Sequence, residues 1–116
     1  MDFPIQEATI KAINEPENWG SGWVKLYETL AKDFMYPAPE DLVVFPDNHD
    51  MMRIYSQVGE DYDNFKLANT YFATTRGVPQ YYYGTEILMS SDGDHRDLHR
   101  VDRRQRQMCI RDRGFI

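Results

Sequence analysis

Residues 42–50 read Leu-Val-Val-Phe-Pro-Asp-Asn-His-Asp, and this stretch decides the fold. Its first four residues are a continuous apolar run, too short for a helix and rich in strand formers. Such a run predicts a strand buried on both faces, as in a parallel sheet. A polar cluster, Asp47 to Asp50, follows at once. Because active sites of parallel α/β folds form where the strands end, this cluster is a candidate site.

The sequence on either side of this strand predicts alternating helices and strands. Residues 1–5 are short, apolar and interrupted by Pro4, which is typical of the end of a strand. Helices are predicted over residues 6–13 and, from an apolar stripe at helical spacing, over residues 23–34. A third helix is predicted from the N-cap Asp61 to about residue 75, and Gly77 suits its C′ position. Another strand is predicted over residues 78–83. This order indicates βαβ units and a parallel sheet, although two or three strands do not distinguish an open sheet from a barrel.

The polar cluster also permits a structural explanation. Asp50 would then cap a following helix, and His49 would be a histidine satisfied at the rim of the fold. Spacing alone favours neither this explanation nor a functional one.

Three segments resemble one enzyme family when they are taken in order. Phe45-x-x-Asn48-His49-Asp50 after an apolar strand resembles the end of the seventh barrel strand of alpha-amylase-type glycoside hydrolases. Residues 76–86, Arg-Gly-Val-Pro-Gln-Tyr-Tyr-Tyr-Gly-Thr-Glu, resemble the eighth-strand pattern of that family, and residues 1–4, Met-Asp-Phe-Pro, resemble the sixth strand of its neopullulanase and cyclomaltodextrinase branch. The resemblance covers about residues 1–95. It implies an α/β fold that is part of a (β/α)8 TIM barrel, about strands 6 to 8 with the intervening helices.

The resemblance also implies roles for particular residues. Family members cleave α-glucosidic bonds with retention, and Asp50 matches the third catalytic acid, which stabilises the transition state by hydrogen bonds to the sugar. His49 matches a histidine that binds the same sugar, and Asn48 is expected mainly to hold the turn. Arg53 is expected to pair with a carboxylate near the site, and Tyr83 to offer a stacking surface for glucose. The predicted substrate-binding set is therefore His49, Asn48, Arg53 and Tyr83, with Tyr82 expected in the core.

Two catalytic groups of the family have no match in this sequence. The nucleophile is an Asp on the fourth strand and the general acid is a Glu on the fifth, and Asp47 and Glu86 fall on neither motif. We therefore expect a fragment of a glycosidase acting on an α-glucan or maltooligosaccharide that is inactive alone. Two alternatives stay open: the parent is a glucan transglycosylase, or the chain is a non-catalytic sugar-binding or interaction module. No cofactor is evident, and calcium is conceivable only for the full-length parent, as in many family members.

Charge divides the 116-residue chain into two unlike parts. Residues 95–116 carry seven Arg against three Asp, although the whole chain has a net charge of −6. Residues 104–112, Arg-Gln-Arg-Gln-Met-Cys-Ile-Arg-Asp, resemble translated sequencing-adapter sequence, so residues 96–116 are predicted to be a non-native and disordered basic tail. The alternatives are a solvated charged segment and a basic patch for nucleic acid. Net acidity disfavours nucleic-acid binding, and the lack of a long apolar run disfavours a membrane span. Oligomeric state and localisation cannot be predicted, although no signal peptide follows Met1.

Overall fold

The described part of the computed structural model, residues 1–91, is organised around two short parallel strands. Strand β1 (Val43–Val44) pairs with β2 (Val78–Pro79), with Val43 opposite Val78. On the other side of β1, the amide of Asp2 donates a hydrogen bond to the Val43 carbonyl at 2.8 Å. The three segments that resemble consecutive barrel strands therefore lie side by side in sequence order, and the predicted parallel pairing is confirmed.

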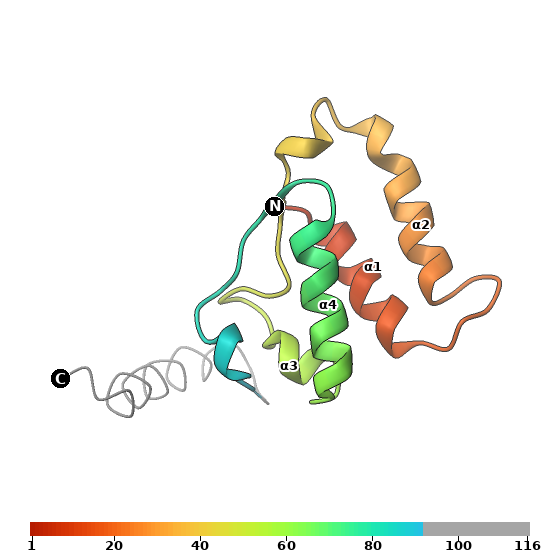
Figure 1. Ribbon diagram of the computed structural model, residues 1–116. Coiled ribbons are helices and arrows are strands. Elements are labelled where there is room, and N and C mark those ends of the chain that lie inside the picture. The colour runs from red at the N-terminus through yellow and green to blue at the C-terminus, as the bar shows by residue number, and fades with distance from the viewer. Residues whose placement is uncertain (92–116) are drawn as a thin grey trace.

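Helices connect these strands, as the sequence pattern predicts (Figure 1). The α-helices are α1 (Phe3–Asn14), α2 (Trp23–Ala31), α3 (Ile54–Gln57) and α4 (Tyr62–Thr74), and the short 3-10 helices are η1 (Lys32–Met35), η2 (Pro39–Asp41) and η3 (Thr85–Ile87). Helix α1 packs against α2 on one side and α4 on the other. No helix within residues 1–91 is long and apolar enough to cross a membrane.

Several predicted boundaries were wrong, and among them the last strand, β2, ends at Pro79 rather than at residue 83. Residues 3–5 belong to α1 rather than to a strand, because the Asp2 carboxylate accepts a hydrogen bond from the Ile5 amide and Pro4 is tolerated in the first helical turn. Asp2, just before this helix, keeps the backbone hydrogen bond to β1. The second α-helix ends at Ala31, three residues early, and the chain continues as η1.

Helix α4 follows its prediction closely, except at its C-terminal end. The Asp61 side chain accepts hydrogen bonds from the amides of Asp63 and Asn64, which confirms it as the N-cap. The C-cap is Thr75, so Gly77 is not needed at C′. Gly77 has φ +107, and a Cβ there would lie 2.5 Å from the Leu42 carbonyl oxygen. It is the close approach of β2 to β1 that requires this glycine.

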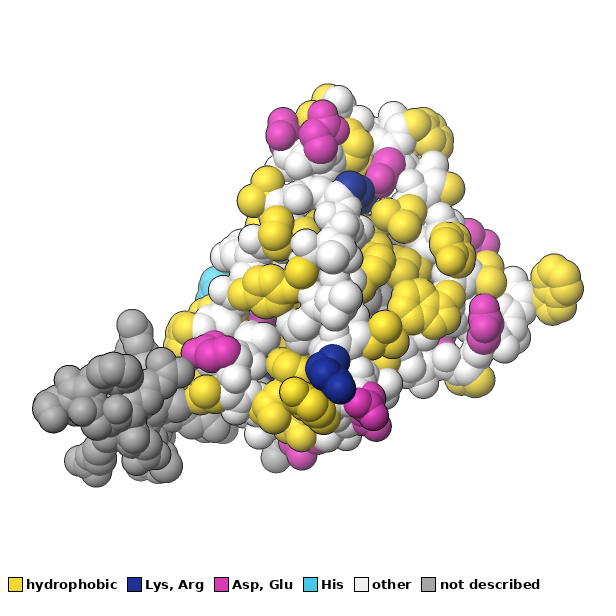
Figure 2. All heavy atoms as spheres, viewed as in Figure 1, with side chains coloured by type: hydrophobic (Ala, Val, Ile, Leu, Met, Phe, Trp, Pro, Cys, Tyr) yellow, Lys and Arg dark blue, Asp and Glu magenta, His cyan; other side chains and the backbone are white. Residues whose placement is uncertain are grey.

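The core lies where α1, α3 and α4 meet β1, and α2 adds one buried residue to it. Its buried members are Ile5, Ala8, Ala12, Leu26, Val44, Ile54, Val58, Phe65, Ala68 and Phe72. Of the predicted stripe on α2, Leu26 alone is buried, whereas Tyr27 and Phe34 are 71% and 85% exposed. Hydrophobic side chains accordingly occupy much of the surface seen in Figure 2. Residues 1–91 therefore leave several large apolar side chains uncovered by one another.

An ion-pair cluster joins three separate segments around Arg76, just before β2. The Arg76 guanidinium pairs with Asp33 of η1, at 2.5 and 2.7 Å, and with the buried carboxylate of Asp2. The hydrogen bonds from Arg76 hold the pKa of Asp33 below its ordinary value of 3.8. The cluster lies before the N-terminal end of β2, whereas the polar cluster follows the C-terminal end of β1.

Candidate active site

The candidate site is the turn that follows β1, where two of the predicted residues project outward. Asn48 is not one of these two, because it is only 7% exposed, and its Oδ1 accepts a hydrogen bond from the Asp50 amide at 2.8 Å. This contact closes the turn, which is the role expected for Asn48. His49 Nε2 lies 3.3 Å from Asp50 Oδ2, and their side chains are 58% and 70% exposed. The turn therefore presents an imidazole and a carboxylate together to solvent.

The structural explanation for Asp50 as a helix cap is wrong. The next helix is α3, and its N-cap is Arg53, three residues later. Asp50 is thus not used by a helix terminus within residues 1–91, and its carboxylate can accept hydrogen bonds from a ligand.

Arg53 is buried beneath this turn, paired with Asp47. Arg53 Nε donates to Asp47 Oδ2 at 2.9 Å, and the Ile54 amide donates to the same oxygen at 2.7 Å. The side chains of Arg53 and Asp47 are 1% and 0% exposed. Arg53 therefore has the carboxylate partner that the sequence suggested. Since both side chains are inaccessible, Asp47 is held as a structural counter-ion and Arg53 does not reach solvent.

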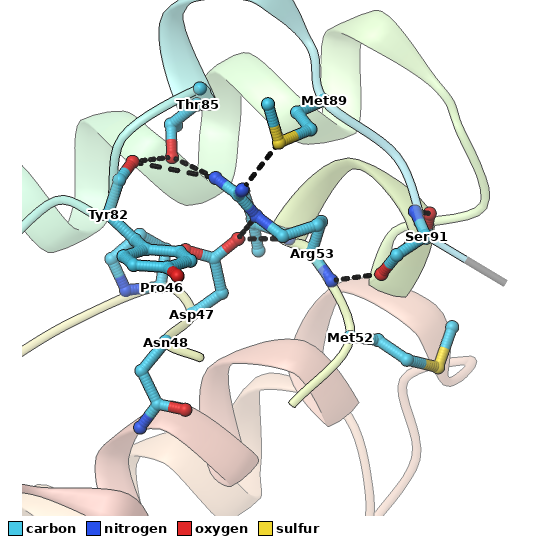
Figure 3. Close-up of polar contacts among 12 residues, drawn as sticks. Pro46, Asp47, Asn48, Met52, Arg53, Tyr82, Thr85, Met89 and Ser91 are labelled. Carbon is cyan, nitrogen blue, oxygen red and sulfur yellow. Dashed lines mark hydrogen bonds and ion pairs between the residues drawn. The ribbon is translucent and has the colours of Figure 1, made fainter. Parts of the chain in front are cut away.

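The same guanidinium also binds the segment that follows β2 (Figure 3). Arg53 Nη2 donates to the Tyr83 carbonyl at 2.7 Å, and Nη1 lies 2.8 Å from Met89 Sδ. The Arg53 amide donates to Ser91 Oγ at 3.2 Å. These contacts tie the chain after β1 to the chain after β2.

The tyrosines after β2 lie beside this buried arginine. The Arg53 guanidinium carbon is 4.7 Å from the Tyr82 ring centroid and 6.0 Å from that of Tyr83. The two rings are 4.5 Å apart. Tyr82 is partly buried, and Tyr83 is 37% exposed. Tyr83 thus keeps an accessible surface. Tyr82 lies against the arginine but is only partly buried and is not part of the core, contrary to the prediction.

Gln6 is a contributor to the site that the sequence did not reveal. It is 4% exposed, and its Nε2 donates to the Pro46 carbonyl at 2.9 Å and to Gln57 Oε1 at 3.0 Å. Helix α1 thereby supports the backbone just before Asp47. A glutamine on the otherwise apolar face of α1, between Ile5 and Ala8, was the only available signal.

Among the predicted site residues within residues 1–91, Asp50 carries the one carboxylate, and it is accessible. A retaining glycosidase needs two carboxyl groups about 5–5.5 Å apart, one as nucleophile and one as acid. Asp47, the nearest acid in sequence, is committed to Arg53. Within residues 1–91 no group of three or more His, Cys, Asp or Glu residues could hold a metal ion. The exposed side chains of Asp50 and His49 can form hydrogen bonds with a polar ligand.

A family model and individual relatives both match this chain to alpha-amylase-type proteins. The family model described as the alpha amylase catalytic domain matches residues 1–112. The cyclomaltodextrin glucanotransferase of Thermoanaerobacterium thermosulfurigenes is 32% identical over 94 residues, covering 81% of this chain and 13% of that protein. The chain thus spans only about an eighth of the length of this relative.

Solved structures place the chain in the same group. The cyclomaltodextrin glucanotransferase CldA, which has a three-domain ABC distribution, superimposes with a TM-score of 0.69 at 36% identity, covering 79% of this chain and 18% of that one. The alpha-amylase of Geobacillus thermoleovorans in complex with acarbose gives a TM-score of 0.67 at 29% identity, covering 84% and 22%. Both belong to the alpha-amylase TIM-barrel proteins, so the helices and the small sheet are consistent with part of a barrel. This chain belongs to the alpha-amylase family, whose catalytic domain it matches over residues 1–112.

Proposed function

We propose that this chain is the C-terminal part of the catalytic barrel of a retaining enzyme that acts on α-glucans. Asp50 is its transition-state-stabilising acid, and His49 binds the same sugar. The observation that carries the proposal is the pair of exposed side chains, His49 and Asp50, on a turn whose base is buried and fixed. In this account Tyr83 lies beside a neighbouring part of the bound glucan.

The reaction needs groups from the rest of the enzyme. A carboxylate nucleophile attacks the anomeric carbon, the glycosidic C–O bond breaks, and a carboxylic acid gives its proton to the leaving oxygen. Water, or a sugar hydroxyl in a transferase, then attacks the glycosyl-enzyme and returns a proton to that acid. Asp50 accepts hydrogen bonds from sugar hydroxyls, and these bonds strengthen as positive charge develops on the ring. The chain alone supplies this stabilisation but neither the nucleophile nor the acid, so we expect it to be inactive.

Hydrolysis and transglycosylation differ only in the acceptor of the second step. Relatives named cyclomaltodextrin glucanotransferase favour the transferase as a second candidate. The first candidate is a hydrolase of the neopullulanase and cyclomaltodextrinase branch, because the Met1–Pro4 segment resembles the sixth strand of that branch. The products of the full-length enzyme distinguish them: a transferase makes cyclodextrins or longer oligosaccharides from maltooligosaccharides, whereas the hydrolase opens cyclodextrins to linear sugars.

The proposed role of Asp50 can be tested with a matched pair of variants in the full-length enzyme. Asp50→Asn removes the charge of an exposed acid in the site, and Asp61→Asn makes the same change at the N-cap of α4, where Asn also caps well. Asp50→Asn is expected to lower kcat/KM on maltooligosaccharides by about 10²–10⁴-fold, the range seen when one such stabilising group is lost. Asp61→Asn should remain near wild type. Equal activity of the two variants would refute the assignment.

A further inference from the structure

We propose that Arg53 is a positioning residue that sets the distance between the two sugar-contacting loops of the site. One loop carries His49 and Asp50 after β1, and the other carries Tyr83 after β2. The inference rests on the proposed function, because it concerns how the same site is held. Arg53 was predicted to bind substrate directly. Because its side chain is buried, we propose that it acts on the substrate through the residues of these two loops.

The contacts of Arg53 with Asp47 fix both ends of the turn that bears Asp50. Asp47, at the start of the turn, accepts from Arg53 Nε at 2.9 Å and from the Ile54 amide at 2.7 Å. One carboxylate oxygen therefore joins the start of the turn to its end. Since Asp50 lies between these anchors and its amide is bound by Asn48, the buried pair holds the backbone that carries the Asp50 carboxylate.

The other contacts of the Arg53 guanidinium hold the loop after β2. Arg53 Nη2 donates to the Tyr83 carbonyl at 2.7 Å, so the arginine holds the backbone of the residue whose ring is exposed. The Tyr82 ring lies 4.7 Å from the guanidinium carbon, and Met89 Sδ lies 2.8 Å from Nη1. Figure 3 shows the guanidinium directed at Asp47 on one side and at the segment from Tyr82 to Met89 on the other.

Only a guanidinium can make this set of contacts at once. Its planar fork of five N–H donors serves an acid, a carbonyl and an aromatic face in fixed directions, whereas the ammonium of lysine is a point charge on a flexible stem. Arg53 is 1% exposed, so it influences a bound sugar only through the loops that it joins. A displacement of about 1 Å at a reacting group lowers a rate about 100-fold, so small loop movements suffice to affect catalysis.

The test compares two conservative substitutions in the full-length enzyme, Arg53→Lys and Arg76→Lys. Both replace an arginine that pairs with carboxylates, but Arg76 lies before β2, away from the turn after β1. Arg53→Lys is expected to lower kcat per active site by about 10- to 100-fold with KM changed little, since Asp50 acts mainly in the transition state. Active sites are counted from the burst of first-product release, which excludes misfolded enzyme. Arg76→Lys should lower the thermal midpoint while leaving kcat per active site unchanged.

A second variant of the same pair extends the test. Asp47→Asn should reduce kcat per active site as Arg53→Lys does, and the double variant should be no worse than the poorer single one, because both break one unit. A wild-type kcat for Arg53→Lys, or equal losses for Arg53→Lys and Arg76→Lys, would overturn the positioning role. An Asp50→Asn variant assayed in parallel separates the two claims. If it stays active, the proposed function fails; if it is inactive while Arg53→Lys has a wild-type kcat, only the positioning role fails.

Discussion

Replacing Gly77 with alanine should disrupt the β1–β2 pairing that places the two site loops side by side. The backbone of Gly77 has φ +107, a conformation that L side chains rarely adopt. An added Cβ would lie 2.5 Å from the Leu42 carbonyl oxygen and 3.0 Å from Val44 Cγ1. The carbonyl is backbone and cannot rotate away, so the two strands must separate.

The expected cost follows from these two effects. A side chain at positive φ costs about 1–2 kcal/mol. The Leu42 carbonyl accepts the Val78 amide at 2.8 Å, and separating the strands weakens this hydrogen bond, which contributes about 0.5–1.5 kcal/mol. Gly77→Ala should therefore destabilise the pairing by about 1.5–3.5 kcal/mol in total.

Gly59→Ala is the matched control for this measurement. Gly59 also has positive φ, +73, but nothing lies within 4 Å of a Cβ built there. It should therefore show only the conformational cost of about 1–2 kcal/mol. Hydrogen exchange followed by mass spectrometry on the full-length enzyme reports the opening free energy of peptides that contain β1 and β2. Equal protection of these peptides in the two variants would refute the steric argument.

Two further predictions concern the stability of the surrounding structure in the full-length enzyme. Because Arg76 lowers the pKa of Asp33, the stability that this pair contributes is present above the ordinary carboxyl pKa of 3.8 and is lost as the pH falls through the lower, folded-state value. Asp33→Asn should therefore reduce the thermal midpoint at pH 6 but not at pH values below that folded-state pKa. If the thermal midpoints of wild type and variant differ by the same amount at both pH values, the lowered pKa does not contribute to stability. Phe72 is fully buried, so Phe72→Ala should cost about 3–5 kcal/mol by hydrogen exchange of α4, whereas Leu67→Ala, on the exposed side of the same helix, should cost under about 1 kcal/mol. Similar losses for the two α4 variants would show that the core is elsewhere.

The parallel arrangement was predictable because it depends on strong, local signals. A short apolar run that ends in a polar cluster predicts a buried strand, and Asp61 ahead of a helical pattern predicts an N-cap; both were confirmed. The boundaries near Asp2 and Gly77 were not predictable to the residue. In both places a contact from a distant segment decides the conformation, the Val43 carbonyl for Asp2 and the Leu42 carbonyl for Gly77.

The exposed part of the site was easier to predict than its support. His49 and Asp50 form a sequence motif, and the structure places their side chains together at the surface. The contacts of Arg53 with Tyr83, Met89 and Ser91 span 30 to 38 residues, so no local pattern could reveal them. The predicted basic tail, residues 96–116, lies outside the described residues, and its adapter-like origin stays a prediction, although the family match extends to residue 112.

We propose that this chain supplies Asp50 and His49 to a catalytic site whose nucleophile and acid lie elsewhere in the enzyme. The most direct measurement is the turnover of a maltooligosaccharide by the purified 116-residue chain, beside its Asp50→Asn variant and the full-length enzyme. We predict product formation by the full-length enzyme and none above background by either form of the chain. Turnover by the chain that Asp50→Asn abolishes would contradict the claim, because the chain would then hold a complete catalytic site.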